Sequence, residues 1–573
     1  MDKPAKIGIM VIAVVAIGLV VFGIFGVANA PFFDLLGSIY QAVIPADKEV
    51  EPVGETPRVA NYYLNFEISE QQVQELARYD IITIDMEAQH VNPERIQEIR
   101  KLNDDIVILA YVTCEEIRSD ASQDQGWNSL RHQLYNGIEK SWWLKDTAGD
   151  HIYYWPETWM INPDTGWSDY LTDFMHDNVM STGLWDGVMY DNVWTDMGWL
   201  DNDWAIDMNR DGQADSGSQI NSAWTQGMTS LLQTARDLDS DSIIVTNGPG
   251  NFSPLTNGRI FENFPNAYEN GYVASKLNYL KRQQESRDPK INIINSNVNN
   301  GEFGDETNYQ RMRFGLTTAL LSDGYYSFDR GDATHHETWW YDAYNFDLGT
   351  PTTGAYVVAD NYLYFQNFAN GIGDYYVYNG GYLSTDPKET ISGNSSVIKK
   401  SSGYYEWNEF LQTNKNLVHL NGNQTYTIQF KYRILEDTDS EKYFYSLMHS
   451  NTGGYSHDIG FTSWNQANHD RSGEMATIVT LDDYDDYSLV FGIRGSGKIA
   501  IDDIYITTGD SDAHIWQRDY TKGSVLVNPT NSSQHLTLEC LYEQRDGTPV
   551  TDVTIPSNDG VLLRSLGVCN TPI

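Results

Sequence analysis

Two acidic residues that end apolar segments are the side chains of this sequence best suited to chemistry. Asp191 follows the apolar run 187–190 and precedes a loop rich in Trp, Asp and Gly, and Glu262 follows Ile260 and Phe261. Glycoside hydrolysis needs one protonated carboxyl group and one ionised carboxylate on opposite sides of the scissile bond. We expect Glu262, whose apolar neighbours would raise its pKa, to be the acid, and Asp191 to stay ionised. The competing interpretations are a turn cap for Asp191 and a salt bridge for Glu262.

Other polar residues that follow apolar segments are predicted to contact the substrate. The carboxyl ends of the strands in a (β/α)8 barrel gather at one rim, so these side chains would surround one opening. Carboxyl groups that share a rim repel one another, which separates their pKa values into those of an acid and a base. The predicted substrate-contact residues are Asp85, Glu115, Trp194, Asn247, Asp329 and His335.

Residues 207–215 have the spacing of a calcium-binding loop. Oxygen-bearing side chains recur at alternate positions, with Gly212 at position 6, and the predicted ligands are Asp207, Asn209, Asp211, Gln213 and Asp215. Position 12 is Ser218 and not Glu, so a bidentate ligand would have to come from elsewhere. We predict a structural Ca²⁺ here; the alternative is a loop of Asx turns that holds no ion.

Eight apolar segments that alternate with helical patterns predict a (β/α)8 barrel over residues 57–350. The expected strands are 59–66, 81–85, 106–112, 187–191, 243–247, 259–262, 291–295 and 325–329, and the expected helices include 70–79, one opening at Asn92-Pro93, 166–180, 219–238 and 308–322. The alternative is an open doubly wound sheet. A nucleotide-binding sheet of that kind would need a Gly-rich turn after an early strand, and none is present, so we expect no organic cofactor.

Short segments rich in Tyr, Thr and Val follow residue 350 and predict β-domains. Residues 365–371 resemble residues 517–523, which suggests that a segment has been inserted between two related stretches. We therefore assign 351–371 and 511–573 to a small closing β-domain and 372–510 to an inserted, carbohydrate-binding-like β-sandwich.

The N-terminus predicts export. Residues 7–27 are almost wholly apolar and long enough to span a bilayer, and Lys3 and Lys6 precede them. We expect a signal anchor at 1–33, a stalk at 34–56, and the bulk of the chain outside the cell membrane. The alternative is secretion after cleavage of a signal peptide near Ala28-Asn29-Ala30.

The formal net charge of -42 excludes a nucleic-acid-binding role, which would require a surplus of Lys and Arg. It is compatible with a solvated extracellular surface. Of the three cysteines, Cys540 and Cys569 can form one bridge in an oxidising compartment, which leaves Cys114 as a buried thiol.

The chain resembles a poorly characterised group of glycoside hydrolases with a (β/α)8 barrel. The resemblance rests on 185–193, on 207–215 with the following 221–224, and on 246–248, 262–263, 348–351 and 525–529. It covers roughly 57–365 and 512–566, and the insert at 372–510 departs from simpler members. The resemblance implies Asp191 as nucleophile and Glu262 as acid/base.

These observations predict a membrane-anchored, extracellular glycoside hydrolase that acts on a polysaccharide and carries a sugar-binding module. The second hypothesis is a catalytically inactive glycan-binding or adhesion protein on the same scaffold. A third, a polysaccharide deacetylase, would need a metal-bound water held by His and Asp, and the sequence shows no clear set of such ligands.

Overall fold

The computed structural model describes residues 56–569, apart from 249–251, 303, 305 and 440. The predicted anchor at 1–33 lies outside these residues, as does all of the predicted stalk except Thr56. Among the residues described, no helix is long and apolar enough to cross a membrane.

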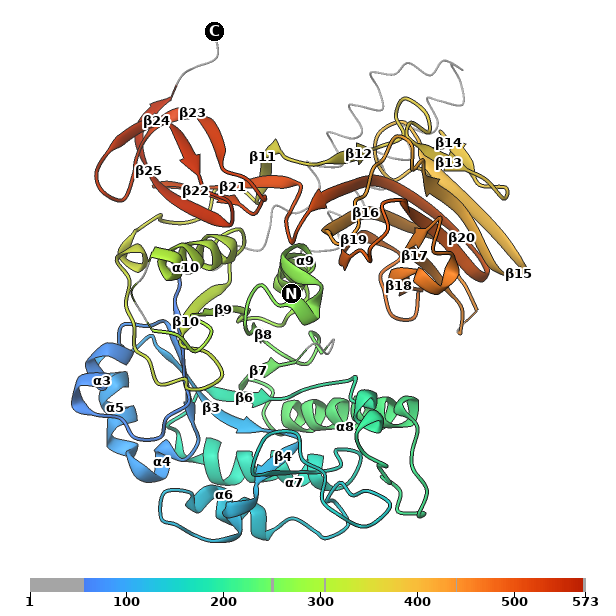
Figure 1. The fold of residues 1–573 in the computed structure, drawn as a ribbon. Coiled ribbons are helices and arrows are strands. Elements are labelled where there is room, and N and C mark those ends of the chain that lie inside the picture. Colours follow the sequence, from blue (N-terminus) through green and yellow to red (C-terminus); the bar gives the residue numbers. More distant parts are fainter. Residues whose placement is uncertain (1–55, 249–251, 303, 305, 440, 570–573) are drawn as a thin grey trace, which may run out of the picture. The chain divides into compact units, whose positions relative to one another are not determined.

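Eight parallel strands form a barrel-like sheet, which confirms the predicted arrangement (Figure 1). Their order in the sheet is β1-β2-β3-β6-β7-β8-β9-β10, and a parallel bridge between Val59 and Tyr326 joins the last strand to the first. Strand ends differ from the sequence prediction by at most three residues. The strands are β1 (Ala60–Tyr63), β2 (Ile81–Asp85), β3 (Val107–Thr113), β6 (Gly187–Asp191), β7 (Ile243–Asn247), β8 (Gly258–Phe261), β9 (Ile293–Asn297) and β10 (Tyr325–Asp329).

Helices separate most of these strands, and local sequence explains several of their ends. Ser69 and Gln72 form a capping box at the start of the first helix, and Pro93 occupies the first turn of another. The longest helix buries Ile220, Trp224 and Met228, which recur at helical spacing. The helices are α3 (Glu70–Leu76), α4 (Ala88–Val91), α5 (Pro93–Leu102), α6 (Ser129–Asn136), α7 (Trp167–Phe174), α8 (Gly217–Leu238), α9 (Gly271–Glu285) and α10 (Glu306–Ala319).

A six-stranded antiparallel sheet closes the chain, in the order β11-β21-β22-β25-β23-β24. Cys540 is disulfide-bonded and lies opposite Cys569 in this sheet, whereas Cys114 is a buried free thiol in the barrel. The strands are β11 (Tyr356–Asp360), β21 (His514–Tyr520), β22 (Gly523–Asn528), β23 (Gln534–Glu543), β24 (Pro549–Ile555) and β25 (Asp559–Cys569).

A nine-stranded antiparallel sheet with its own apolar core lies between β11 and β21 in the chain. Its strands are β12 (Tyr364–Gln366), β13 (Tyr375–Val377), β14 (Tyr382–Ser384), β15 (Ser396–Thr413), β16 (Thr425–Glu436), β17 (Tyr443–Ser450), β18 (Ile459–Trp464), β19 (Ser472–Thr480) and β20 (Tyr487–Thr508).

The pairing of β12 corrects the expected limits of the insert. We assigned residues 351–371 to the closing domain, but β12 pairs with β20 of the nine-stranded sheet, while only β11 pairs with β21. The insert therefore begins between β11 and β12 and not at residue 372. The similarity between 365–371 and 517–523 consequently does not reflect equivalent positions in one sheet.

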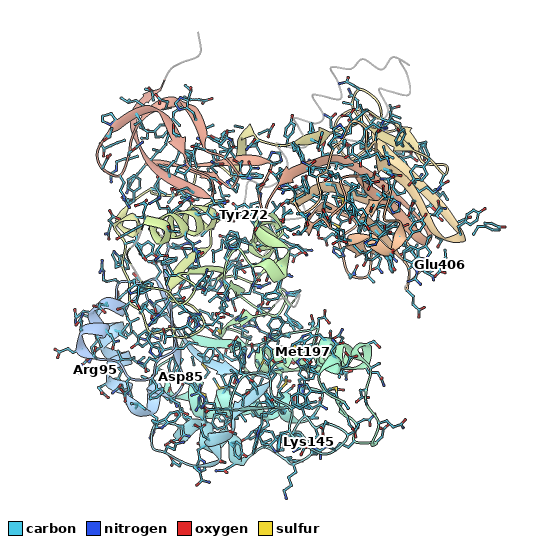
Figure 2. The ribbon with its side chains drawn as sticks, in the orientation of Figure 1. Asp85, Arg95, Lys145, Met197, Tyr272 and Glu406 are labelled. Carbon is cyan, nitrogen blue, oxygen red and sulfur yellow. The ribbon has the colours of Figure 1, made fainter. Side chains whose placement is uncertain are left out.

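A buried ion pair connects α9 to the segment that leaves the insert. Lys276 of α9 and Asp512 are 2% and 0% exposed and form a direct ion pair. The Trp516 ring lies 4.0 Å from Lys276 Nζ, and its Nε1–H donates to Asp512 Oδ2 at 2.9 Å. One turn earlier in α9, Tyr272, labelled in Figure 2, donates its backbone N–H to Asp510 at 2.9 Å. This contact joins the barrel to the chain segment between β20 and β21.

Candidate active site

Strand alternation places the central polar side chains at the mouth of the barrel. Met189, Val245 and Ile260 belong to the apolar cluster that fills the interior. Side chains two residues apart on a strand face the same side, so Asp191, Asn247 and Glu262 lie one layer further along. The same alternation brings Tyr111, two residues after Leu109 in β3, to this layer. Tyr111 is not among the predicted site residues, although this alternation identifies it.

Asp191 is buried and held by hydrogen bonds. Tyr111 Oη donates to its Oδ2 at 2.6 Å, and the backbone N–H of Asn192 donates to its Oδ1 at 2.8 Å. Burial raises the pKa of Asp191, and the bonds from Tyr111, Asn192 and Asn247 oppose that rise by stabilising the ionised form. These donors favour the ionised state that the sequence predicted, although burial works against it.

Asn247 links the two central carboxyl groups. Its Nδ2–H donates to Glu262 Oε2 at 2.7 Å, and its side chain also stabilises the charge of Asp191. Burial and then the negative charge of Asp191 raise the pKa of Glu262 to about 7, against the lowering effects of His335 and Asn247. A group with this pKa is well suited to give and take protons near neutral pH.

His335 and Asp329 lie beside Glu262. His335 Nδ1 is 3.0 Å from Asp329 Oδ2, which also accepts the Asn295 amide at 2.9 Å. His335 Nε2 is 3.5 Å from Glu262 Oε1. Burial lowers the pKa of His335, but Asp329 and then Glu262 raise it to about 9. Asp329 is only 2% exposed, so its predicted substrate contact is replaced by a role in holding His335.

Asp85 does not present a free carboxylate to the opening. Both of its oxygens accept hydrogen bonds from the Arg131 guanidinium, at 2.7 and 2.6 Å (Asp85 is labelled in Figure 2). Oδ1 also accepts the backbone N–H of Glu87 at 2.9 Å. The bidentate pair occupies the group that we expected to contact substrate, because α6 brings in an arginine that the strand pattern could not reveal.

Glu115 is also displaced from its predicted role. It is completely buried, and its Oε2 accepts Trp224 Nε1–H at 2.8 Å. Burial raises its pKa well above the usual range, which favours the neutral form of this internal acid. Its neighbour Glu116 lies nearer the site, 3.4 Å from Asn192 Nδ2, and burial raises the pKa of Glu116 to about 7.

Two aromatic residues flank the same opening. Trp194 is half-buried, and its Nε1–H donates to Asn192 Oδ1 at 3.3 Å, next in the chain to Asp191. Its contact with substrate stays a prediction. The Tyr62 ring lies 4.6 Å from that of His335, and the charges of Asp191 and Glu262 act on its hydroxyl. These contacts add Tyr62, which the sequence did not single out, to the wall of the site.

The loop 207–215 is folded by its own backbone amides. Asp207 accepts the N–H groups of Asp211 and Gly212 at 3.0 and 2.9 Å, and Asp215 accepts that of Met208 at 2.7 Å. Among the residues described, the three acidic or histidine side chains whose ligand atoms converge lie elsewhere, at Glu262, Asp332 and His335. Calcium binding by this loop stays a prediction.

Comparison with known protein families bears directly on this site. Residues 100–372 match hypothetical glycosyl hydrolase family 15. The family 15 match includes Asp191, Asn247, Glu262, Asp329 and His335, and it begins after Asp85. The resemblance to a glycoside hydrolase group is thereby confirmed for this segment. No curated protein matches the chain.

Solved structures offer more distant similarities. The glycoside hydrolase domain of PelA from Pseudomonas aeruginosa is 13% identical, covers 49% of this chain and 97% of its own, and has a TM-score of 0.32. A family 22 carbohydrate-binding module of Clostridium thermocellum Xyn10B is 13% identical, covers 27% and 96%, and has a TM-score of 0.20. A xylan-binding domain from Paenibacillus barcinonensis Xyn10C is 8% identical, covers 27% and 97%, and has a TM-score of 0.20. At these values none of them assigns an activity to this chain.

Proposed function

We propose that this chain is an exported, membrane-anchored glycoside hydrolase that cleaves a polysaccharide through Asp191 and Glu262. The main support is the Asn247 side chain, which joins one buried, hydrogen-bonded carboxylate to one acid with a pKa of about 7. The family 15 match over the same residues agrees with this chemistry.

In the proposed reaction, Glu262 gives its proton to the glycosidic oxygen as the bond from that oxygen to the anomeric carbon breaks. Asp191 attacks the anomeric carbon and forms a covalent ester. Glu262, now ionised, takes a proton from water as the water oxygen displaces Asp191 and releases the sugar. Tyr111 and Asn192 hold Asp191 in place through both of its oxygens.

The test is sugar release by the purified full chain from a panel of polysaccharides, measured as new reducing ends. Release by the wild type supports the proposal. Polysaccharide binding without release at any pH, unchanged in Asp191→Asn, would contradict it and favour the adhesion protein. Acetate release without new reducing ends would favour a deacetylase.

We further propose that the inserted sandwich binds the polysaccharide through one face of its sheet. Pairing across β15, β20 and β17 aligns Trp407 with Arg494 and Tyr443. Phe444 and Ile493, the next residues along, belong to the core, so the aligned side chains lie on the opposite face. The Arg494 guanidinium lies 5.1 Å from the Trp407 ring and 5.3 Å from the Tyr443 ring.

This face has the composition of a sugar-binding surface. Trp407 is 51% exposed, and Tyr445, one row further along, lies 5.3 Å from its ring. Gly492 lies between Glu409 and Tyr445, where a Cβ would come within 2.1 Å of the tyrosine ring. Glycine therefore allows the ring to lie across the sheet, beside the Glu409 carboxylate. Aromatic rings stack on sugar faces and nearby polar groups select hydroxyls.

Replacing Trp407 by Ala is expected to weaken polysaccharide binding about tenfold or more, because it removes a half-exposed ring from this face. Affinity electrophoresis in gels that contain the bound polysaccharide measures this loss. Tyr362→Ala is the matched control, since Tyr362 is 43% exposed but packs against Phe365 and Tyr505 instead. Equal effects of both substitutions would argue against this face.

We also propose that the loop 207–215 binds a structural Ca²⁺. The ion would draw several oxygen ligands of the loop together and would stiffen the segment that follows β6. Calcium at about one hundred times its Kd is expected to stabilise the fold by roughly 2.7 kcal/mol, seen as a rise in Tm over the EDTA-treated chain. Asp207→Asn should abolish that rise. An identical Tm with calcium and with EDTA would mean that the amide hydrogen bonds alone hold the loop.

A further inference from the structure

Three metal-ligating side chains converge beside the acid of the proposed reaction. Glu262, Asp332 and His335 each offer one ligand atom, and these atoms all lie within 4.8 Å of one another. Glu262 follows β8, whereas the other two come from the loop after β10. We propose that these three residues form a site for a divalent cation of the zinc type, which takes imidazole and carboxylate ligands.

Each of the three side chains is held through the atom that would not bind the metal. Asn247 Nδ2–H donates to Glu262 Oε2, which leaves Oε1 towards His335. Asp329 Oδ2 accepts from His335 Nδ1 at 3.0 Å, which leaves Nε2 for the ion. This carboxylate–histidine arrangement is the usual second layer of a zinc site, because it fixes the tautomer and orientation of the ring.

The third ligand has the same kind of support. Asn263 Nδ2–H donates to Asp332 Oδ1 at 3.2 Å, which leaves Oδ2 free of this bond. Asn263 in turn accepts a hydrogen bond from Asn297, at the end of β9. A polar residue from an adjacent strand end therefore orients Asp332, although this carboxylate is exposed.

The spacing of His335 and Glu262, which form an ion pair without bound metal, is also compatible with a shared ion. His335 Nε2 and Glu262 Oε1 are 3.5 Å apart, beyond the usual N–H···O range of about 2.7–3.2 Å. Two ligands bound tetrahedrally at about 2.0–2.1 Å from zinc lie roughly 3.3–3.4 Å apart. The two atoms are thus separated by nearly the distance that a common ion would impose.

Occupation of this site would control the reaction. A Glu262 carboxylate that is bound to zinc cannot donate to the leaving oxygen, so the bound cation acts as an inhibitor. This consequence rests on the proposed glycoside hydrolase function. Binding of the ion does not, and the two can be tested separately.

The binding test is a calorimetric titration of the EDTA-treated and desalted full chain with ZnCl2 at pH 8, in which bound zinc displaces protons from its ligands. We expect one equivalent of zinc to bind the wild type, with affinity at least tenfold weaker in His335→Gln and in Asp332→Asn. His336→Gln is the matched control, because it removes an exposed imidazole one residue away and should leave binding unchanged. Absence of binding, or equal losses in all three variants, would overturn the proposal.

The activity test compares zinc inhibition of the wild type and of Asp332→Asn, each relative to its own metal-free rate, because the charge of Asp332 also raises the pKa of Glu262. Asp332→Asn should resist zinc at concentrations that inhibit the wild type. Equal zinc inhibition of both proteins, or activation of the wild type by zinc, would overturn the inhibitory role. If no polysaccharide is cleaved, the proposed function fails while the titration still decides whether the site binds metal.

Discussion

Replacing Asp191 by Asn is expected to lower kcat/KM by a factor of roughly 10³ or more while leaving the fold intact. The amide is nearly isosteric, and its one oxygen can still accept the Tyr111 hydrogen bond, although its NH2 group cannot accept the Asn192 N–H. It carries no negative charge to attack the anomeric carbon. The measurement is reducing-end release from the polysaccharide that the wild type cleaves. Asp196→Asn, an exposed acid in the loop that follows β6, is the matched control and should retain full activity.

Glu262→Gln should cause a loss of roughly 10²- to 10⁴-fold, since it removes the proton donor. Because Glu262 acts in its protonated form and its pKa is raised to about 7, wild-type kcat/KM, assayed with EDTA, should fall as pH rises through that value. The residual activity of Glu262→Gln should not show this fall in kcat/KM at alkaline pH. If the activity of Glu262→Gln still falls as pH rises through about 7, another group is responsible for the titration. Full activity in Asp191→Asn would mean that the catalytic centre lies elsewhere on the rim.

Removing one partner of the Lys276–Asp512 pair is expected to be the most destabilising single change outside the site. Both side chains are almost completely buried, so Asp512→Ala leaves an ammonium group without its counterion. Breaking such a pair typically costs about 3–5 kcal/mol. Thermal unfolding followed by calorimetry should show a clearly lower Tm.

Lys400→Met is the control for this stability prediction. Lys400 also pairs with an acid, Glu436 at 2.7 Å, but both side chains are about half exposed. Water screens such a pair, and its loss should cost about 0–1 kcal/mol. The double variant Lys276→Met/Asp512→Leu removes both charges and should recover part of the Asp512→Ala loss. Similar Tm values for Asp512→Ala and Lys400→Met would show that the buried pair contributes little.

The dependence on pH follows from the charge of Asp512. Burial raises the pKa of the Asp512 carboxyl group. Lys276, His514 and the hydrogen bond from Trp516 lower this pKa by more than burial raises it, so the net shift is downward. A carboxyl group with a lowered folded-state pKa stabilises the fold fully above its unfolded pKa of about 3.9. This contribution is lost as pH falls below that value. The difference in Tm between wild type and Asp512→Ala should therefore narrow in strong acid.

The sequence was sufficient to place the barrel strands and the centre of the site. Each strand is a short apolar run, and where a run ended on Asp191, Asn247 or Asp329 the strand in the structure ends within two residues of that position. Parallel strands in sequential order bring their carboxyl ends to one rim, so these residues meet although up to 138 positions separate them in the chain.

The partners of the site residues could not be predicted, because they come from elements whose position depends on tertiary packing. Arg131 reaches Asp85 from α6, and Trp224 reaches Glu115 from α8, and neither distance along the chain nor residue type reveals these contacts. The limit of the insert was missed for a similar reason. Short strands such as β12 carry too few residues to show which sheet they join.

The two ends of the insert leave the closing sheet side by side. Asp360 and His514 are paired across β11 and β21, and the backbone N–H of Asn361 donates to the carbonyl of Ala513 at 2.7 Å. Because the insert leaves β11 and enters β21 at paired residues, a hairpin turn can replace the insert without moving either strand. The inserted sandwich could therefore be deleted without breaking the closing sheet. A variant that keeps Asp512 and joins β11 to β21 by a short turn would separate the proposed hydrolysis from the proposed binding of the polysaccharide by the sandwich.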